Sequence, residues 1–282
     1  MNLYSVVMLD LGGTLLDSNN QISPNTKRLL NRLQQRGIPV ILCSSGPPSG
    51  AIAAARLCGL TDLLVCYDGS LILDQNQNIL QDTGIDGETA LRLKQAAAVE
   101  FPDIAVTSCL YDIWLADSVQ DPNVLAFGKR YGREAIEGPL RNALQSNGHA
   151  HKMICLGQPL RLKNFQNWAA PLFPSLSVSA FGATCLDITA AGVSKGAAMK
   201  KIQSYYNVTA EQIVAVGDYF TDMEMLRRAG LGIAMGNAPE AVKRAAARVT
   251  ASNDEEGVYI ALKNLRFRPP TEKENPPEIQ TD

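Results

Sequence analysis

The chain has 282 residues, the length of one large domain or two ordinary ones, and no stretch approaches the roughly 18 apolar residues of a membrane-spanning helix. Its 26 Lys and Arg residues nearly balance 28 Asp and Glu residues, and this formal charge of −2 argues against nucleic acids and anionic membranes as partners. With 46% hydrophobic and 19% charged residues, the composition is that of a folded globular protein.

The cysteines and the N-terminus indicate where the protein works. Most of the six cysteines lie inside apolar runs, and none forms a Cys-x-x-Cys pair, so buried thiols in a reducing cytoplasm are expected. Asp10 interrupts the first apolar run, which has no basic stretch before it, so no signal peptide is predicted. The two histidines, His149 and His151, are too few for a structural zinc site and are expected at a surface turn.

Five short apolar runs are predicted as strands, because each stops at small or polar residues. They cover residues 4–9, 38–43, 63–66, 213–216 and 231–235. Their continuous apolar pattern is typical of parallel strands covered on both faces. Helices are expected between them, from the Ser23-Pro24 cap to Gly37 and over 195–206, 221–229 and 239–247. This alternation predicts a doubly wound α/β fold.

The middle of the chain has a different pattern. Helices are predicted at 87–100, 123–131 and 160–170, with strands at 105–107, 111–116, 153–156, 175–181 and 184–188. We therefore expect an inserted α+β cap domain over residues 81–187, within a core domain made of residues 1–80 and 188–268. Such an insert is the layout of a lid over an active site. Residues 269–282 hold four prolines and four acidic residues and are predicted to be disordered.

Polar side chains follow the predicted strands, at the sheet edge where ligands of such folds bind. Asp10 follows the first strand, Ser45 and Gly46 the second, and Asp68 the third. Any one of them can be explained as an ordinary turn or helix-start residue.

Two further segments add charge to this predicted edge. Asp218 and Asp222 follow the fourth strand, and together with Asp10 they offer three carboxylates, a donor set that suits Mg²⁺. Lys195 opens a helix, where its charge opposes the helix dipole, so a role in binding an anion competes with that of a solvated surface lysine. An N-cap role for an aspartate of the 218–222 loop is the alternative there.

Taken together, these motifs resemble the haloacid dehalogenase superfamily, in its Cof-type branch of sugar-phosphate phosphatases with a large α/β cap. The resemblance covers roughly residues 3–266. The stretches that carry it are residues 9–17, 192–197, 214–222, 232–238 and 253–258.

The resemblance implies a role for each matching residue. Asp10 corresponds to the nucleophile that attacks phosphorus, and Lys195 to the cation that neutralises charge on the nucleophile and the phosphoryl group. The expected substrate is a small phosphorylated metabolite, bound by Ser45, Gly46, Lys195 and Asp68. The expected cofactor is Mg²⁺, held by Asp10, the Gly12 carbonyl, Asp218 and Asp222, the last directly or through water.

Four positions depart from the family pattern. Gly12 stands where a second aspartate is usual, and that aspartate protonates the leaving group and activates the attacking water. The loss of a general acid–base typically costs about 10²–10⁴ in rate. Pro47 replaces an arginine, Asp68 an asparagine, and Thr221 an asparagine.

Two interpretations follow from these departures. In the first, the protein is a working but altered phosphatase, with Asp68 as substitute for the missing acid–base, so that Asp68→Asn abolishes turnover and Gly12→Asp gains little. In the second, it is a pseudo-phosphatase that binds a phosphorylated ligand or a protein partner. The sequence specifies neither the substrate nor the oligomeric state.

Overall fold

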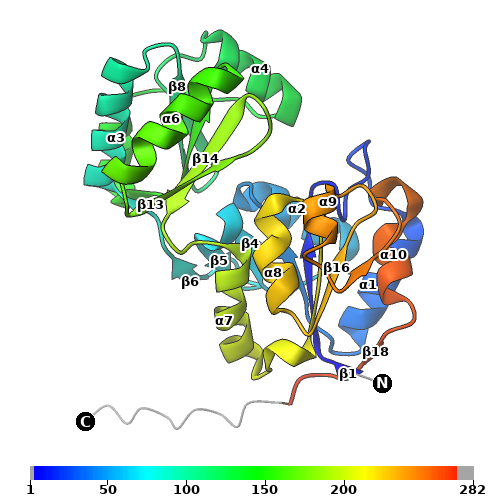
Figure 1. The fold of residues 1–282 in the computed structure, drawn as a ribbon. Helices are drawn as coiled ribbons and strands as arrows, with labels where there is room; N and C mark the ends of the chain where they lie inside the picture. Colours follow the sequence, from blue (N-terminus) through cyan, green and yellow to red (C-terminus); the bar gives the residue numbers. More distant parts are fainter. Residues whose placement is uncertain (1–2, 272–282) are drawn as a thin grey trace, which may run out of the picture. The chain divides into compact units, whose positions relative to one another are not determined.

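The computed structural model describes residues 3–271, so the predicted disorder of the tail lies, from residue 272 onward, outside the described residues. The chain forms two compact units (Figure 1). Unit 1 comprises the residues up to Gly46, Gly50–Asn78 and the residues from Ser194 onward. Unit 2 comprises Pro47–Ser49 and Ile79–Val193, so the insert is a body with its own fold.

Unit 1 is built on a mainly parallel sheet with strand order β17-β16-β15-β2-β3-β4-β5. All residues of its four central strands are buried, which confirms the prediction from their continuous apolar runs. Only β5 runs antiparallel to its neighbour β4. The strands are β2 (Val6–Asp10), β3 (Val40–Cys43), β4 (Leu64–Cys66), β5 (Leu71–Leu73), β15 (Ile213–Gly217), β16 (Leu231–Ala234) and β17 (Arg248–Val249). Beside this sheet, β1 (Leu3–Tyr4) pairs with β18 (Arg266–Phe267).

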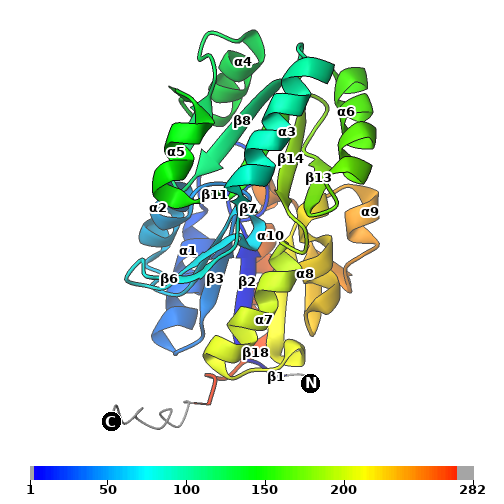
Figure 2. The same cartoon turned by 90° about the vertical axis from the view of Figure 1, so that its left-hand side faces the viewer.

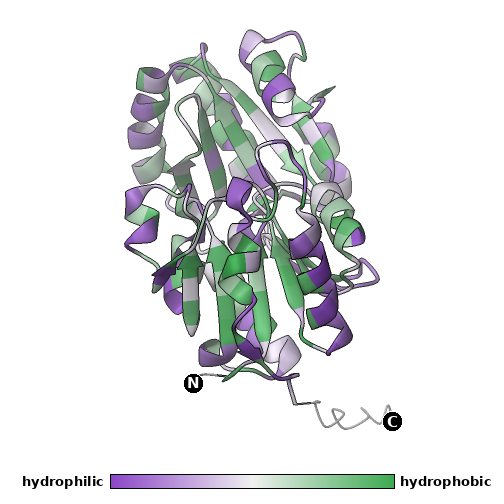
Figure 3. Cartoon of the chain, turned by 90° about the vertical axis from the view of Figure 1, so that its right-hand side faces the viewer, coloured by the Kyte–Doolittle hydropathy of each residue, from purple (hydrophilic) through white to green (hydrophobic). Residues whose placement is uncertain are grey.

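Helices cover both faces of this sheet (Figures 1 and 2). On one face lie α1 (Pro24–Gln35) and α10 (Gly257–Leu262); on the other lie α7 (Lys195–Tyr206) and α8 (Met223–Arg228). In Figure 3 the strands of unit 1 are predominantly apolar, whereas the helices carry polar residues as well. The doubly wound α/β prediction is therefore confirmed.

Local signals set the boundaries of some helices. The Ser23 side chain accepts a hydrogen bond from the Thr26 backbone and caps α1, as predicted. Helix α7 has the predicted bounds, but α9 (Glu240–Lys243) ends earlier than predicted, because the chain turns back so that Ala247 donates to the Gly232 carbonyl. Helix α2 (Pro48–Cys58) has weak amphipathicity and was not predicted.

Unit 2 has a six-stranded sheet with order β10-β9-β8-β12-β14-β13, in which all pairs except β9/β10 are antiparallel. This confirms the predicted α+β insert, although β14 extends past the expected boundary at residue 187. The strands are β8 (Ala105–Leu110), β9 (Ile113–Ala116), β10 (Ile136–Glu137), β12 (Lys152–Leu156), β13 (Leu176–Ala180) and β14 (Cys185–Ala190).

Four helices accompany this sheet, and leucines, phenylalanines and alanines from three of them form one apolar core with its strands. The helices are α3 (Gly87–Glu100), α4 (Pro122–Tyr131), α5 (Leu140–Asn147) and α6 (Pro159–Leu172). Helix α3 has the predicted bounds, whereas α5 was not predicted. The short strands β7 (Ile85–Asp86) and β11 (His149–Ala150) pair with each other, and β6 (Ile79–Asp82) precedes them.

The two histidines belong to a hydrogen-bonded cluster inside unit 2. His151 is fully buried, so the expectation of a surface position is wrong for it. Its Nδ1 accepts a hydrogen bond from the Tyr111 backbone, which leaves the proton of the neutral ring on Nε2, 3.0 Å from Asp82 Oδ1. His149 Nε2 lies 2.7 Å from the same oxygen, and the Tyr111 hydroxyl donates to Asp82 Oδ2. These contacts hold Asp82, the last residue of β6, in place. A proton on His151 Nε2 leaves that nitrogen without a lone pair for a metal ion, so we interpret the cluster as structural.

The state of the cysteines and the character of the helices match the expectations from the sequence. All six cysteines are buried and free, as predicted. Over the part of the chain that the structure describes, no helix has the length and apolar character required to cross a bilayer.

Helix α1 offers a direct test of the packing in unit 1. Leu30 is fully buried, whereas Leu29 on the same helix is only partly buried. We expect Leu30→Ala to lower the free energy of unfolding by about 2–5 kcal/mol, because it removes buried surface and leaves a cavity. Leu29→Ala is the matched control and should cost less than half as much in the same urea titration. Equal costs for the two variants would contradict the orientation of α1.

Candidate active site

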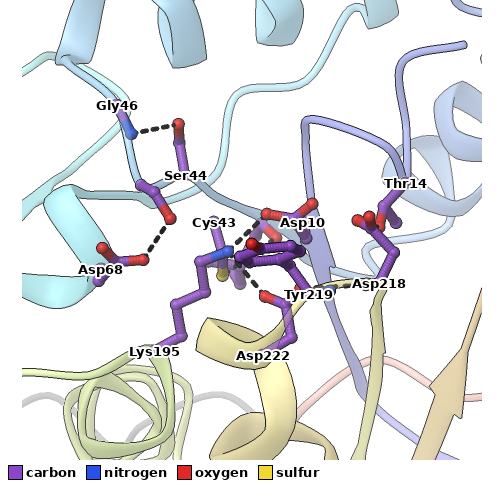
Figure 4. A network of polar contacts seen from close by, with 12 residues as sticks. Asp10, Thr14, Cys43, Ser44, Gly46, Asp68, Lys195, Asp218, Tyr219 and Asp222 are labelled. Atoms are coloured by element: carbon purple, nitrogen blue, oxygen red, sulfur yellow. Dashed lines mark hydrogen bonds and ion pairs between the residues drawn. The ribbon is translucent and has the colours of Figure 1, made fainter. Parts of the chain in front are cut away.

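The carboxyl ends of four neighbouring strands bring the predicted residues together in unit 1. Because the strand order is β15-β2-β3-β4, Asp10 at the end of β2 lies beside the loops that carry Asp218, Ser45 and Asp68. Lys195 reaches the same place from the first turn of α7 (Figure 4). Residues that are far apart in sequence thus form one polar cluster at the sheet edge.

Lys195 is the centre of this cluster. Its side chain is 1% exposed, so the surface-lysine alternative is wrong. Its Nζ donates to Asp10 Oδ1 over 2.5 Å and to Asp222 Oδ1 over 2.7 Å. The Ser194 hydroxyl caps α7 by accepting from the Ala197 backbone and thereby fixes the turn from which the lysine extends. One buried ammonium therefore joins the end of β2 to the loop after β15.

Asp222 shapes the loop after β15 and faces the lysine at the same time. Its Oδ2 accepts hydrogen bonds from the backbones of Asp218 (3.0 Å) and Tyr219 (2.9 Å). The close approach of this loop requires Gly217, since a Cβ there would lie 2.6 Å from the Asp222 Cβ. The Asp222 side chain is fully buried, and these contacts hold it in one position.

Asp218 is positioned by the loop after β2. The Thr14 hydroxyl donates to Asp218 Oδ1 over 2.7 Å, and the Asn237 amide donates to the Gly13 carbonyl over 2.9 Å. Gly13 has φ +77°, and a Cβ there would lie 2.5 Å from Asp218 Oδ2. Sequence reasoning assigned no role to Thr14 or Asn237, although both lie within the stretches that carry the family resemblance.

Burial and like charges perturb the acid–base behaviour of this cluster. Burial, together with Asp222 and Asp218, raises the pKa of Asp10 well above its usual value despite the opposing effect of Lys195. Burial and Asp222 raise the pKa of Asp218 to about 6. Although burial acts to lower the pKa of Lys195, the carboxylates of Asp10 and Asp222 outweigh it and raise the pKa well above the usual value. The site thus holds more negative charge than its ammonium balances.

The three carboxylates fit a divalent cation. Oxygens of Asp10, Asp218 and Asp222 lie within 4.8 Å of one another, and all three residues are buried. Carboxylate oxygens are the donors that Mg²⁺ prefers, and a cation would relieve the crowding that raises the pKa values of Asp10 and Asp218. Gly12 lies in the turn that follows Asp10, and its carbonyl remains a predicted fourth ligand.

The residues expected to bind substrate lie on the other side of the lysine. The Ser45 hydroxyl donates to Asp68 Oδ1 over 2.5 Å, and the Gly46 backbone N–H donates to the Ser44 hydroxyl. Asp68 is 6% exposed and adopts a left-handed conformation, with φ 58°, in the 3₁₀ turn Tyr67–Gly69. Its negative charge contributes to the raised pKa of Lys195, so Asp68 belongs to the same electrostatic cluster.

Position 12 has room for a side chain. A Cβ built on Gly12 meets no atom within 4 Å, in contrast to Gly13 beside it. The missing carboxylate at position 12 is therefore not a consequence of crowding in this loop.

The carboxyl ends of the parallel strands thus bring together three buried aspartates, two of which contact the buried ammonium of Lys195. The sequence model of haloacid dehalogenase-like hydrolases matches residues 7–262. The chain belongs to that superfamily, in its Cof-type branch, among the phosphoric monoester hydrolases.

Named relatives and solved structures agree with this assignment. A putative phosphatase of Haemophilus influenzae is 30% identical over 92% of this chain and 97% of its own. A 5-amino-6-(5-phospho-D-ribitylamino)uracil phosphatase of Bacillus subtilis is 28% identical over 92% of this chain and 96% of its own. The crystal structure of a haloacid dehalogenase-like hydrolase from Bacteroides thetaiotaomicron superposes with a TM-score of 0.81 at 25% identity, over 92% and 98%.

The raised pKa of Asp218 makes a prediction about stability. Between its usual value of 3.8 and about 6, the folded protein holds a proton that the unfolded chain has lost, so the free energy of unfolding falls as the pH rises through this window. Asp218→Asn removes that cost and preserves an acceptor for Thr14. At pH 8 without metal, we expect the variant to be more stable by about 1–3 kcal/mol in urea titrations.

The same variant tests the metal site. Mg²⁺ should stabilise the wild-type protein, because it binds the folded state, and should stabilise Asp218→Asn much less. Equal stabilisation of both proteins by Mg²⁺, or a metal-free variant that is less stable than the wild type at pH 8, would contradict this description of the carboxylates.

Proposed function

We propose that the protein is a cytoplasmic, Mg²⁺-dependent phosphatase that cleaves a small phosphorylated metabolite through an aspartyl phosphate on Asp10. The observation that carries this proposal is the buried ammonium of Lys195 between Asp10 and Asp222. It holds the Asp10 carboxylate in a fixed direction and keeps positive charge next to it, as attack of an anion on a phosphate ester requires.

Each residue of the cluster has a role in this proposal. Asp10 Oδ attacks phosphorus, and Lys195 offsets the charge of both the carboxylate and the phosphoryl oxygens. The Ser45 hydroxyl binds a phosphoryl oxygen. Asp10, Asp218, Asp222 and the Gly12 carbonyl would hold Mg²⁺, which supplies further neutralisation of phosphoryl charge when bound. Thr14 and Asn237 are positioning residues, since they fix Asp218 and the Asp10 loop.

A second candidate function is binding of a phosphorylated ligand without turnover. The specific observation that favours it is Gly12, which offers no proton to a leaving group and no base to the water that must cleave an aspartyl phosphate. The two functions share the same cluster and differ in whether the covalent intermediate is hydrolysed.

The Asp10→Asn variant is the first test of the proposed function. We expect Mg²⁺-dependent release of phosphate by the wild type, and its loss by at least about 10³-fold in the variant, because the amide is a poor nucleophile. The panel should include sugar phosphates, nucleotides, an aryl phosphate and 5-amino-6-(5-phospho-D-ribitylamino)uracil, the substrate named for two relatives. Equal release by the two proteins would refute the role of Asp10; binding without release would support the second candidate.

Gly12→Asp tests whether the missing carboxylate limits the rate. Because the position has open space, the aspartate should fit without displacing the loop. We expect turnover to rise by about 10–10³-fold, as a general acid–base is regained, in contrast to the small gain expected if Asp68 substitutes for residue 12. Gly12→Asn is the matched control, of nearly equal size but without acid–base capacity, and should give no such gain. If Gly12→Asp leaves the rate unchanged, another group already supplies the proton.

A further inference from the structure

The hydroxyl of Ser45 is committed to a carboxylate in the ligand-free protein. A serine hydroxyl has a single proton to donate, and here that proton is given to Asp68 Oδ1 over 2.5 Å. Toward an incoming anion, Ser45 then presents only lone pairs, and the buried negative charge of Asp68 lies directly behind it. In this state the pair repels a phosphoryl group rather than binding it.

Protonation of Asp68 reverses the direction of this hydrogen bond. A neutral carboxyl group donates its own proton to Ser45 Oγ, and the serine proton is then free to point at a phosphoryl oxygen. One proton from solvent ends on Asp68, no bond other than hydrogen bonds changes, and the charge behind Ser45 disappears.

The groups around Asp68 decide when this happens. From α7, the Lys195 ammonium favours the ionised carboxylate in the empty site. From β4 the titratable neighbour is the buried thiol of Cys66, β5 supplies none, and the turn itself adds Tyr67. Asp10 and Asp222 lie across the ammonium. A bound phosphoryl dianion partly neutralises the positive charge of Lys195 and places a second negative charge near Asp68. Both effects favour the protonated form of Asp68.

We infer that Asp68 takes up a proton when a phosphoryl group binds at Ser45, so that this site binds tetrahedral oxyanions better at lower pH. The inference rests on the proposed function, because it requires that Ser45 bind the phosphoryl group. It gives Asp68 a role on the phosphoryl side of the site, different from that of a substitute for residue 12. Asp68 is therefore a positioning residue whose protonation state sets the donor capacity of Ser45.

The test compares binding of one probe by the wild type and Asp68→Asn. Sulfate in the presence of Mg²⁺ is a suitable probe. It stays a dianion from roughly pH 5.5 to 8.5, so a change in its binding over this range reports on groups of the protein and not on the probe. Asparagine tolerates the left-handed backbone at position 68, and its amide can donate to Ser45 without a proton from solvent. Asp74→Asn, which removes a carboxylate from an exposed turn of unit 1, is the matched control.

The expected results are specific. At pH values above the pKa of Asp68, the affinity of the wild type and Asp74→Asn for sulfate should fall by up to about tenfold per pH unit. In the same range, calorimetry in buffers of different ionisation enthalpy should show that binding takes up about one proton. Asp68→Asn should bind with little pH dependence, without this proton uptake, and more tightly than the wild type at pH 8.

Each other outcome overturns the inference. An identical pH dependence in the wild type and Asp68→Asn would show that another group takes the proton, and weaker binding by Asp68→Asn at every pH would show that the carboxylate itself supports the anion. Loss of turnover in Asp68→Asn without tighter binding would favour the acid–base role instead. If neither protein binds sulfate with Mg²⁺ while Asp10-dependent phosphate release is measured, only this inference fails; if both are absent, the proposed function fails.

Discussion

One buried ammonium group sets the conditions for the rest of the site. The Nζ of Lys195 lies within hydrogen-bond distance of Asp10 and Asp222, and Asp68 acts on it electrostatically from the other side. Removal of one partner from a buried ion pair typically costs about 3–5 kcal/mol, because the other charge is left without compensation. The lysine is therefore needed for the fold as well as for the proposed chemistry. The remaining excess of negative charge is what makes the cluster receptive to a divalent cation.

The backbone around this group follows from the same constraint. Several carboxylates can approach one ammonium only if their loops pass very close to each other, and glycine occupies the tightest points. A side chain on Gly13 would collide with Asp218, and one on Gly217 would collide with Asp222. Gly69 lies against the carbonyl of Ser194, which brings the turn that carries Asp68 next to the start of α7. Gly12 is the exception, because the space beside it is open.

The sequence was informative where the determining interactions are local. Continuous apolar runs located β2, β3, β15 and β16, and the capping residue Ser23 marked the start of α1. Helix α2 was not predicted because its apolar residues do not form a clear stripe, and α5 was not predicted because it is short and begins after Pro139, which provides no side-chain cap. His151 was misplaced because its burial depends on hydrogen bonds to Tyr111 and Asp82, which are distant in sequence.

The residues of the candidate site could be predicted from the sequence, but the contacts between them could not. Motif spacing identified Asp10, Lys195 and the 218–222 loop, whereas the strand order was needed to place Ser45 beside Asp68. The burial of Lys195 also depends on that order, which is why its sequence context left a surface position open. The direction of a hydrogen bond, on which the role of Asp68 depends, has no sequence signal.

The central claim is that the carboxylate of Asp10, which is hydrogen-bonded to Lys195, accepts the phosphoryl group from the substrate. Mass spectrometry of the protein, acid-quenched during incubation with Mg²⁺ and an acyl phosphate, tests it most directly. The account predicts a phosphoryl adduct on the peptide that contains Asp10, present with Mg²⁺, absent with a chelator, and long-lived because Gly12 offers no base for its hydrolysis. Phosphate release without an adduct at Asp10, or an adduct on another residue, would contradict it.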